Sequence, residues 1–394
     1  MDFDLSEFDG LRDEVRAWCA ARWPNGVAPR IWDDGPRGEM WKQDYRAAMR
    51  ALGERGWLCG GWPVEHGGGG WRVLKQAVFN ELAAYYRIPG TGLTNSGTSI
   101  IGPTIMIYGS ADQKRAFLPP IARGEVRWAL GFSEPDAGSD LAGLRTRAVI
   151  DDDEFVVNGS KVWNHSSDTE LMLLLARTNP AAPKHQGISQ FILPLMGTRG
   201  VTIQPILDLL GHERWTLVTF EDVRLPRSAM IGEINRGWYQ QTTSLDLERA
   251  QMGWLGEARR SFDELLSLAR RTNLSGGPAL ADSFVRDRLG ALAVELELAR
   301  WIAYRVAYLQ DRGEIPNAPA SISKLWTSEV QQRIQRAGVN LLGVVGLLAE
   351  GSQYSVDRGV WNLEYWEAIG TSIAGGASEI QRNIIATRGL GMPR

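Results

Sequence analysis

The sequence predicts an α+β protein with three consecutive parts: a helical region, a strand-rich block and a bundle of long helices. Apolar residues recur at helical spacing through residues 1–124. Turn residues punctuate short apolar runs through residues 125–236. Helical spacing returns at residue 237 and continues through 237–394. We expect three domains with these boundaries, because a chain of 394 residues exceeds the length at which one core usually keeps growing.

The helical region contains two amphipathic segments. The first places these apolar residues on one helical face: Phe8, Leu11, Val15, Trp18 and Cys19. The second has the same spacing at Trp41, Tyr45, Met49 and Leu52. Such stripes predict helices that each bury one face.

The central block reads as a small antiparallel sandwich or barrel. The expected strands are 126–130, 145–150, 154–157, 161–163, 171–176, 188–195, 201–206 and 216–220. The Asp-rich residues 151–153 and the pair Asn158-Gly159 are typical of hairpin turns. Beyond this block, long helices are expected at about 240–271, 283–312, 320–345 and 378–388.

Composition excludes several classes of function. The net charge is −3 and no basic stretch stands out, which argues against a nucleic-acid partner. The acidic N-terminus lacks the apolar region of a signal peptide, and no run of about 18 apolar residues predicts a membrane span. The two cysteines, Cys19 and Cys59, favour a reducing, cytoplasmic setting. The four histidines show no metal-ligand spacing, so no metal site is expected.

The most specific stretch is Leu130-Gly-Phe-Ser-Glu-Pro-Asp-Ala-Gly-Ser-Asp140. It reads as a strand that ends in a turn of small residues. Ser133 offers a hydroxyl, and Gly138-Ser139 exposes backbone N–H groups at a bend that can hold an anion or a polar ring edge. A plain capped turn is the alternative interpretation.

This stretch resembles the signature of the acyl-CoA dehydrogenase family. Further similar segments follow in the family's order: Gly159 to Trp163, Glu221 to Pro226, Ile231 to Trp238, Glu297 to Arg300, and Ser378 to Arg382. The resemblance implies an N-terminal helical domain, a central β-domain, a C-terminal four-helix bundle and an FAD cofactor. It implies cofactor contacts at Phe132, Ser133, Gly138, Ser139 and Trp163, with Ser139 also near the substrate. In the reaction of this family, a carboxylate removes the α-proton of an acyl-CoA thioester and flavin N5 accepts the β-hydride.

The sequence departs from the family pattern at the base. The usual glutamate position before the last helix is Gly375, within Ala374-Gly375-Gly376-Ala377. A branch similar to isovaleryl-CoA dehydrogenase has its base one residue before an arginine, and Leu245-Asp-Leu-Glu248-Arg249 matches that pattern. Glu248 therefore resembles the alternative base. The other interpretation is an ordinary carboxylate on a helix surface. The resemblance places Asp246, Arg249, Gly375 and Gly376 near the substrate.

Other cofactor segments are also altered. A small hydroxyl residue usually follows the tryptophan near flavin N5, and here His165 or Ser166 could take that place. The pyrophosphate motif keeps Arg271 but lacks its aromatic-glycine pair, and the partner motif reads Asn340-Leu-Leu-Gly343. In the family these two segments reach the FAD of a neighbouring subunit. Ala377 and Glu379 occupy positions similar to adenylate contacts.

Three functions stay open from the sequence. The first is an active dehydrogenase acting on a bulky acyl group such as a steroid side chain, within a homo-oligomer or a heteromer and with an electron-transfer flavoprotein as acceptor. The second is a non-catalytic partner subunit of a heteromeric dehydrogenase. The third is a flavin monooxygenase or oxidase on the same fold, which needs no α-proton base.

Overall fold

The computed structural model describes residues 5–30, 39–91, 95–165, 167–247 and 252–393. The chain forms two compact units that do not follow sequence order. The helical unit comprises Met1–Ala28, Arg72–Ile88 and Arg249–Arg394, and the sheet unit comprises Pro29–Trp71 and Pro89–Glu248. The first 124 residues therefore contribute to both units, and the boundaries of the three expected domains stay a prediction.

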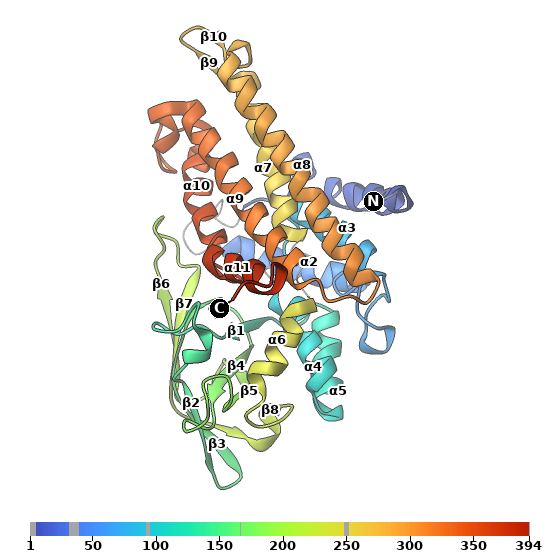
Figure 1. Ribbon diagram of the computed structural model, residues 1–394, viewed down its shortest axis with the longest axis vertical. Helices are drawn as coiled ribbons and strands as arrows, with labels where there is room; N and C mark the ends of the chain where they lie inside the picture. Colours follow the sequence, from blue (N-terminus) through green and yellow to red (C-terminus); the bar gives the residue numbers. More distant parts are fainter. Residues whose placement is uncertain (1–4, 31–38, 92–94, 166, 248–251, 394) are drawn as a thin grey trace. The chain divides into compact units, whose positions relative to one another are not determined.

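The sheet unit is built on one eight-stranded sheet (Figure 1). Seven strands follow the order β6-β7-β3-β2-β4-β5-β8, and β1 pairs in parallel with β4. The strands are β1 (Trp128–Gly131), β2 (Arg147–Asp151), β3 (Glu154–Asn164), β4 (Leu171–Arg177), β5 (Ile188–Pro194), β6 (Val201–Ile206), β7 (Trp215–Pro226) and β8 (Met230–Ile231). Each expected strand of the central block overlaps an observed one, but 154–157 and 161–163 are joined in β3, and β8 was not expected. The sheet is mixed rather than antiparallel because β1 and β2 both pair in parallel with β4.

The expected hairpin turn at Asn158-Gly159 is wrong. Strand β3 runs through both residues, and the hairpin between β2 and β3 closes at the Asp-rich turn instead. Between the pairs Val157–Val223 and Gly159–Phe220, strand β7 contains one residue more than β3. Gly159 has a φ of +142°, and a Cβ there would stand 2.6 Å from the hydroxyl of Thr146. Gly159 therefore lies at a β-bulge, where the backbone passes too close to Thr146 to leave room for a side chain.

Helices complete the sheet unit. They are α2 (Glu39–Glu54), α4 (Gly102–Tyr108), α5 (Ala111–Ala122) and α6 (Gly237–Leu247). Helix α5 begins with a capping box in which Ser110 and Gln113 each bond the other's backbone amide. The Gln113 amide also donates to the carbonyls of Ser228 and Met230 at 2.8 and 2.9 Å, which holds the short helix Arg227–Ala229 and the start of β8 against this helix.

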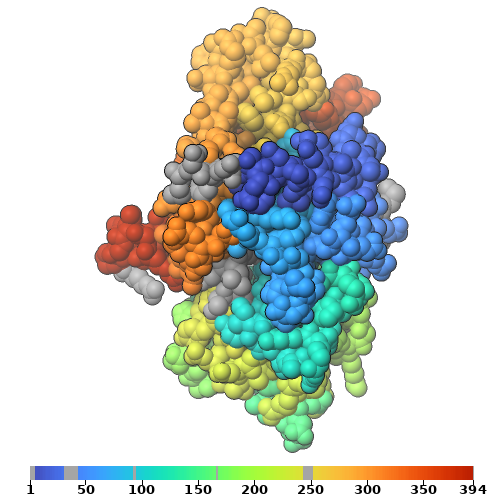
Figure 2. Space-filling model, turned by 90° about the vertical axis from the view of Figure 1, so that its right-hand side faces the viewer, coloured from blue at the N-terminus to red at the C-terminus, as the bar shows by residue number. Residues whose placement is uncertain are grey.

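The helical unit contains a bundle of long helices, as expected (Figure 1). Helix α9 contacts each of α7, α8 and α10. The helices are α1 (Asp9–Ala20), α3 (Val73–Tyr85), α7 (Met252–Arg271), α8 (Ser283–Asp311), α9 (Asn317–Leu342), α10 (Val360–Thr371) and α11 (Ser378–Ile384). Helix α1, dark blue in Figure 2, lies at the surface of this unit and packs on α3.

Most apolar stripes bury as the sequence predicts. Leu11, Val15, Trp18 and Cys19 of α1 are buried, and so are the α2 residues Tyr45, Met49 and Leu52. Helix α10 was not predicted, because apolar residues occupy so many positions of Val360–Thr371 that no single face stands out. Within the described residues, none of the helices has the length and apolar character that crossing a membrane requires.

Candidate active site

The loop after β1 is fastened along strand β3. The backbone amide of Val162 donates to the carbonyl of Ser133 at 2.9 Å. The ammonium group of Lys161 donates to the carbonyl of Phe132, also at 2.9 Å. The structure thus brings two predicted cofactor contacts, Phe132 and Ser133, beside the strand that carries Trp163.

A buried ion pair underlies this loop. Glu134 and Lys161 are 8% and 0% exposed, and their charged atoms lie 2.8 Å apart. Glu134 also accepts from the backbone amides of Arg145 at 2.6 Å and Thr146 at 2.8 Å. Burial lowers the pKa of Lys161 to about 8, against the opposing effect of Glu134. Burial alone would raise the pKa of Glu134, but Lys161 and the backbone donors hold it below its usual value.

Sequence reasoning did not single out this pair. The available signal was a glutamate inside the most specific stretch of the chain and a lysine at the start of an expected strand. A charged residue at such a position needs a buried partner. Only the packing of β1 beside β3 shows that Glu134 is that partner.

Gly138 and Ser139 form an exposed bend. No atom lies within 4 Å of a Cβ built on Gly138, so the backbone there is open. The chain that follows is fixed, because the guanidinium of Arg177 donates to the carbonyls of Ala142 at 2.7 Å and Leu144 at 3.1 Å. An open bend on a fixed base can receive an anion or the polar edge of a ring.

Trp163 combines strain with exposure. Its φ is +63°, a left-handed conformation that costs a bulky residue about 1–2 kcal/mol. The side chain is 58% exposed, and its ring meets the edge of Trp215 at a centroid distance of 6.5 Å. The pairing of β3 with β7 is irregular between Lys161 and Asn164, which aims this side chain out of the ladder. A strained, exposed indole suits contact with a flat ligand.

His165 is held in one orientation. Its ring stacks on Trp215 with centroids 4.4 Å apart and planes 30° apart, and Nδ1 lies 3.1 Å from the carbonyl oxygen of Arg214. Because a carbonyl only accepts, Nδ1 donates and Nε2 is the acceptor of the neutral ring. Burial, assisted by Arg214 and Arg127, lowers the pKa of His165 to about 4, so the ring is neutral near pH 7. Ser166 lies outside the described residues.

The turn between α10 and α11 contains two left-handed glycines. Gly375 has a φ of +64° and Gly376 a φ of +90°. The side-chain amide of Gln381 donates to both of their carbonyls at 3.2 Å. A Cβ on Gly376 would stand 2.4 Å from that amide nitrogen. Ala377 caps α11, and Glu379 lies exposed in its first turn. The position of the usual family glutamate thus carries a glycine whose backbone disfavours any side chain.

The two altered FAD motifs come together in the helical unit. Arg271, at the end of α7, forms an ion pair with Asp357, which also accepts from the indole N–H of Trp361 at 3.1 Å. Helix α9 ends where the amide of Gly343 donates to the carbonyl of Asn340. The short helix that begins at Gly343 contacts the one that carries Asp357.

Within the helical unit, this pair of motifs lies apart from the glycine turn. Strand β9 (Asn273–Leu274), just after Arg271, is at one end of the unit, and α11 lies toward the other (Figure 1). Glu248 and Arg249 fall outside the described residues, between Leu247 of α6 and Met252 of α7. Asp246 lies in the last turn of α6.

Glu257 on α7 is a second carboxylate with altered acidity. Its side chain reaches solvent, but the surrounding protein desolvates the carboxylate, and the charge of Glu364 adds to the effect. Together they raise the pKa of Glu257 to about 7, although Arg87 and Gln331 oppose the shift. A carboxylate with a pKa near neutrality is suited to proton transfer. Sequence reasoning missed it because Glu364 and Gln331 belong to α10 and α9, far along the chain.

Three family models match consecutive parts of the chain. Residues 6–125 match the N-terminal domain of acyl-CoA dehydrogenases, residues 129–223 the middle domain and residues 235–390 the C-terminal domain. Together they cover most of the chain, including the loop after β1 and the glycine turn.

Individual relatives agree. The acyl-CoA dehydrogenase FadE26 of Mycobacterium tuberculosis is 35% identical, over 89% of this chain and 88% of that protein. The acyl-CoA dehydrogenase IpdE1 of the same organism is 32% identical, over 99% and 98%. The solved structure of the Tcur3481-Tcur3483 steroid ACAD is 33% identical with a TM-score of 0.89, and both chains are fully covered. The chain therefore belongs to the acyl-CoA dehydrogenase family of FAD-dependent oxidoreductases.

Proposed function

We propose that this chain introduces an α,β double bond into the CoA thioester of a bulky acyl group, such as one derived from a steroid. The observation that carries the proposal is the left-handed Gly375, which leaves the usual base position without a carboxylate or any other side chain. A missing side chain also leaves space for a wide acyl group. The likeness to a structure described as a steroid ACAD supports this substrate class.

The base in this proposal is Glu248. It stands in the sequence Leu245-Asp-Leu-Glu248-Arg249, which resembles the branch with a relocated base. A carboxylate enclosed with an acyl chain loses solvation, which raises its pKa and strengthens it as a base toward the α-proton. Asp246 and Arg249 are proposed to contact the CoA chain. Glu257, with its pKa of about 7, is the rival base among the described residues.

The residues of the sheet unit fit a bound flavin. The exposed indole of Trp163 offers a flat surface, and the open bend at Gly138-Ser139 offers backbone N–H groups to polar atoms. The bound FAD supplies the hydride acceptor of the reaction. The acceptor nitrogen Nε2 of His165 suits a hydrogen-bond donor on the ring edge, because its neutral tautomer is fixed by Arg214.

The ion pair beneath the loop has a positioning role in this proposal. Lys161 connects the carbonyl of Phe132 to the carboxylate of Glu134, which in turn binds the backbone at Arg145 and Thr146. These bonds fix the loop relative to the strand of Trp163. The pair contacts neither substrate nor flavin in this account, so its loss should weaken FAD binding rather than remove a reacting group.

A second candidate function is that of a partner subunit in a heteromeric dehydrogenase. It is favoured by Arg271, whose guanidinium forms an ion pair with Asp357 of its own chain. Two structural relatives are described as two-component assemblies, the Tcur3481-Tcur3483 steroid ACAD and the ChsE4-ChsE5 complex from Mycobacterium tuberculosis, the latter 32% identical with a TM-score of 0.86. An electron-transfer flavoprotein is the proposed electron acceptor for the catalytic form.

The test is the anaerobic visible spectrum of the purified protein during titration with acyl-CoAs. The panel contains steroid-derived, branched and straight-chain thioesters. Wild type should be yellow and should bleach most with the bulky thioesters. Glu248→Gln should keep its yellow colour, and Glu257→Gln is the matched control that should bleach like wild type.

Each departure from this result has a definite meaning. Bleaching by Glu248→Gln together with a yellow Glu257→Gln would move the base to Glu257. Reduction by straight chains alone would remove the bulky substrate. A colourless wild type that gains flavin only with a related chain would favour the partner subunit. A yellow protein that no thioester reduces, but that consumes oxygen when its flavin is reduced, would favour a monooxygenase.

A further inference from the structure

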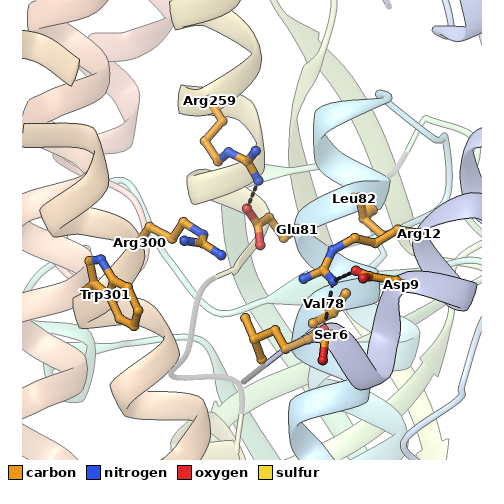
Figure 3. Close-up of a pocket in the computed structure, with 10 residues that line it drawn as sticks. Ser6, Asp9, Arg12, Val78, Glu81, Leu82, Arg259, Arg300 and Trp301 are labelled. Atoms are coloured by element: carbon orange, nitrogen blue, oxygen red, sulfur yellow. Dashed lines mark hydrogen bonds and ion pairs between the residues drawn. The ribbon is translucent and has the colours of Figure 1, made fainter. Parts of the chain in front are cut away.

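A pocket of about 420 Å³ opens in the helical unit, among the start of the described chain and helices α1, α3, α7 and α8 (Figure 3). None of the residues that line it is a proposed base, flavin contact or substrate contact. Its volume is within the range of small-molecule sites, about 300–1,000 Å³. Three arginines reach it, from three different helices: Arg12, Arg259 and Arg300.

One of the three arginines is neutralised by a buried carboxylate. Glu81 of α3 is 3% exposed and accepts from the guanidinium of Arg259 and from the hydroxyl of Tyr304. Burial, and to a smaller extent Glu81, raises the pKa of Tyr304. The hydroxyl of Tyr304 therefore stays protonated and donates its hydrogen bond to the carboxylate of Glu81. The negative charge of Glu81 is therefore committed to Arg259.

The other two arginines keep positive charge at the pocket. Arg12 donates to the carbonyl of Leu5 at 2.8 Å and to Asp9 at 2.6 Å, and the Asp9 side chain is 66% exposed. Arg300 donates to Glu297 at 3.2 Å, and that side chain is 54% exposed. Water screens both carboxylates. Among the described residues these bonds use only Nη1 of each guanidinium, so further N–H donors remain.

The two guanidinium groups converge. In Figure 3 they point toward each other across the pocket, with Glu81 between them in this view and its bound Arg259 above Glu81. An acid group between Arg12 and Arg300 could accept hydrogen bonds from both sides. Charge-assisted bonds of this kind are the stronger class of hydrogen bond in proteins.

The remaining wall suits a flat apolar group. Trp301 follows Arg300 on α8 and is 41% exposed, and its ring centroid lies 5.7 Å from the Arg300 guanidinium carbon. Leu5, Val78 and Leu82 add apolar side chains. A ligand with a planar ring could therefore lie against the indole while its acid group meets the arginines.

We propose that this pocket binds a small organic anion in which a phosphate or carboxylate group is attached to a flat ring. Arg12 and Arg300 bind the acid group, Trp301 contacts the ring, and Glu81 keeps Arg259 in place beside them. This assignment stands independently of the proposed dehydrogenase reaction, because it uses none of that reaction's residues.

Isothermal titration of the FAD-loaded protein at low salt tests the pocket. The probes are phenyl phosphate, benzoate, inorganic phosphate and the neutral benzyl alcohol. We expect one molecule of phenyl phosphate or benzoate to bind per chain, with the tighter of the two identifying the acid group. Inorganic phosphate should bind more weakly, and benzyl alcohol should not bind.

Variants locate the binding. Arg12→Gln and Arg300→Gln should each weaken the preferred anion about tenfold, the loss expected from one charge-assisted bond. Arg300→Lys should retain more affinity than Arg300→Gln because it keeps the charge. Trp301→Leu should reduce the ring-bearing anion to the affinity of inorganic phosphate. Arg288→Gln, an exposed arginine on the same helix and outside the pocket, is the matched control and should change nothing.

Thermal unfolding midpoints accompany each titration, so that misfolding is not mistaken for lost binding. The assignment is overturned if wild type binds neither ring-bearing anion, if folded Arg300→Gln binds as tightly as wild type, or if benzyl alcohol binds as well as the anions.

Discussion

In the described part of each unit a buried glutamate is paired with a cation, but the two pairs differ in their access to water. In the sheet unit, Glu134 and Lys161 are both buried. In the helical unit, the Glu81 side chain is 4% exposed, but that of its partner Arg259 is 39% exposed. The first pair is enclosed by backbone donors, and the second lines an open pocket.

The difference shows how the same chemistry serves two purposes. A pair that is enclosed on all sides can only hold protein segments together, and it does so for the loop after β1. In the other pair, the buried Glu81 neutralises the partly exposed Arg259 and holds it in place. The neighbouring arginines of the pocket stay available to a ligand. Desolvation is the deciding factor, since an unpaired charge costs most where water cannot reach it.

The largest expected effect is on the enclosed pair. Lys161→Met leaves Glu134 buried without its counter-charge, and breaking a buried pair in this way costs about 3–5 kcal/mol of stability. Thermal unfolding monitored by circular dichroism and FAD retention on gel filtration would measure it. The double variant Lys161→Met with Glu134→Leu is the control and should recover part of the loss. Equal instability of the single and double variants would contradict the role assigned to this pair.

A smaller effect is expected in the helical unit. Glu81→Gln keeps a hydrogen-bond acceptor for Tyr304 but removes the charge beside Arg259. Because Arg259 can turn its guanidinium toward water, the cost should be about 1–3 kcal/mol. The same unfolding assay applies. A loss as large as that of Lys161→Met would show that partial exposure does not distinguish the two pairs.

The pH dependence of stability should also separate the pairs. The folded-state pKa of Lys161 is about 8, below its usual 10.5, so the unfolded chain binds more protons between these pH values. The contribution of Lys161 to the free energy of unfolding therefore rises with pH across this window. Between pH 7.5, 9 and 10, the unfolding midpoint of wild type should rise relative to that of Lys161→Met. A constant difference between the two proteins would refute the lowered pKa.

The smallest effect is expected for an exposed pair. Arg224 contacts Asp151 at 2.8 Å and Glu154 at 2.9 Å, and all three side chains are widely exposed. Solvent and salt screen such contacts. Arg224→Gln should leave the unfolding midpoint unchanged within error. A clear drop would mean that distance, and not burial, sets the strength of ion pairs in this protein.

Much of the fold could be predicted because it depends on local pattern. The stripe from Leu11 to Cys19 predicted a helix with a buried face, and short apolar runs between turn residues predicted the strands from β2 to β7. Asn158-Gly159 shows where local pattern fails. The dipeptide favours a turn, but pairing of β3 with β2 and β7 on both sides outweighs that preference and makes Gly159 part of a bulge.

Some features of the candidate site could likewise be predicted from the sequence, and others could not. The stretch from Leu130 to Asp140 and the absence of a carboxylate at Gly375 are properties of the sequence itself. The assignment of Glu248 as base stays a prediction. The pKa of Glu257 near 7 could not be predicted, because it arises first from desolvation by the surrounding protein and then from carboxylates on another helix.

The order of helical and strand-rich parts, the family signature and the missing glutamate can be read from residue type and spacing along the chain. The contact of Lys161 with Glu134, the ion pair of Arg271 with Asp357, and the convergence of Arg12 and Arg300 on one pocket appear only when the chain is folded. Each of these depends on residues far apart in sequence that meet when helices and strands pack. Their charges interact strongly only because that packing also sets how much water remains between them.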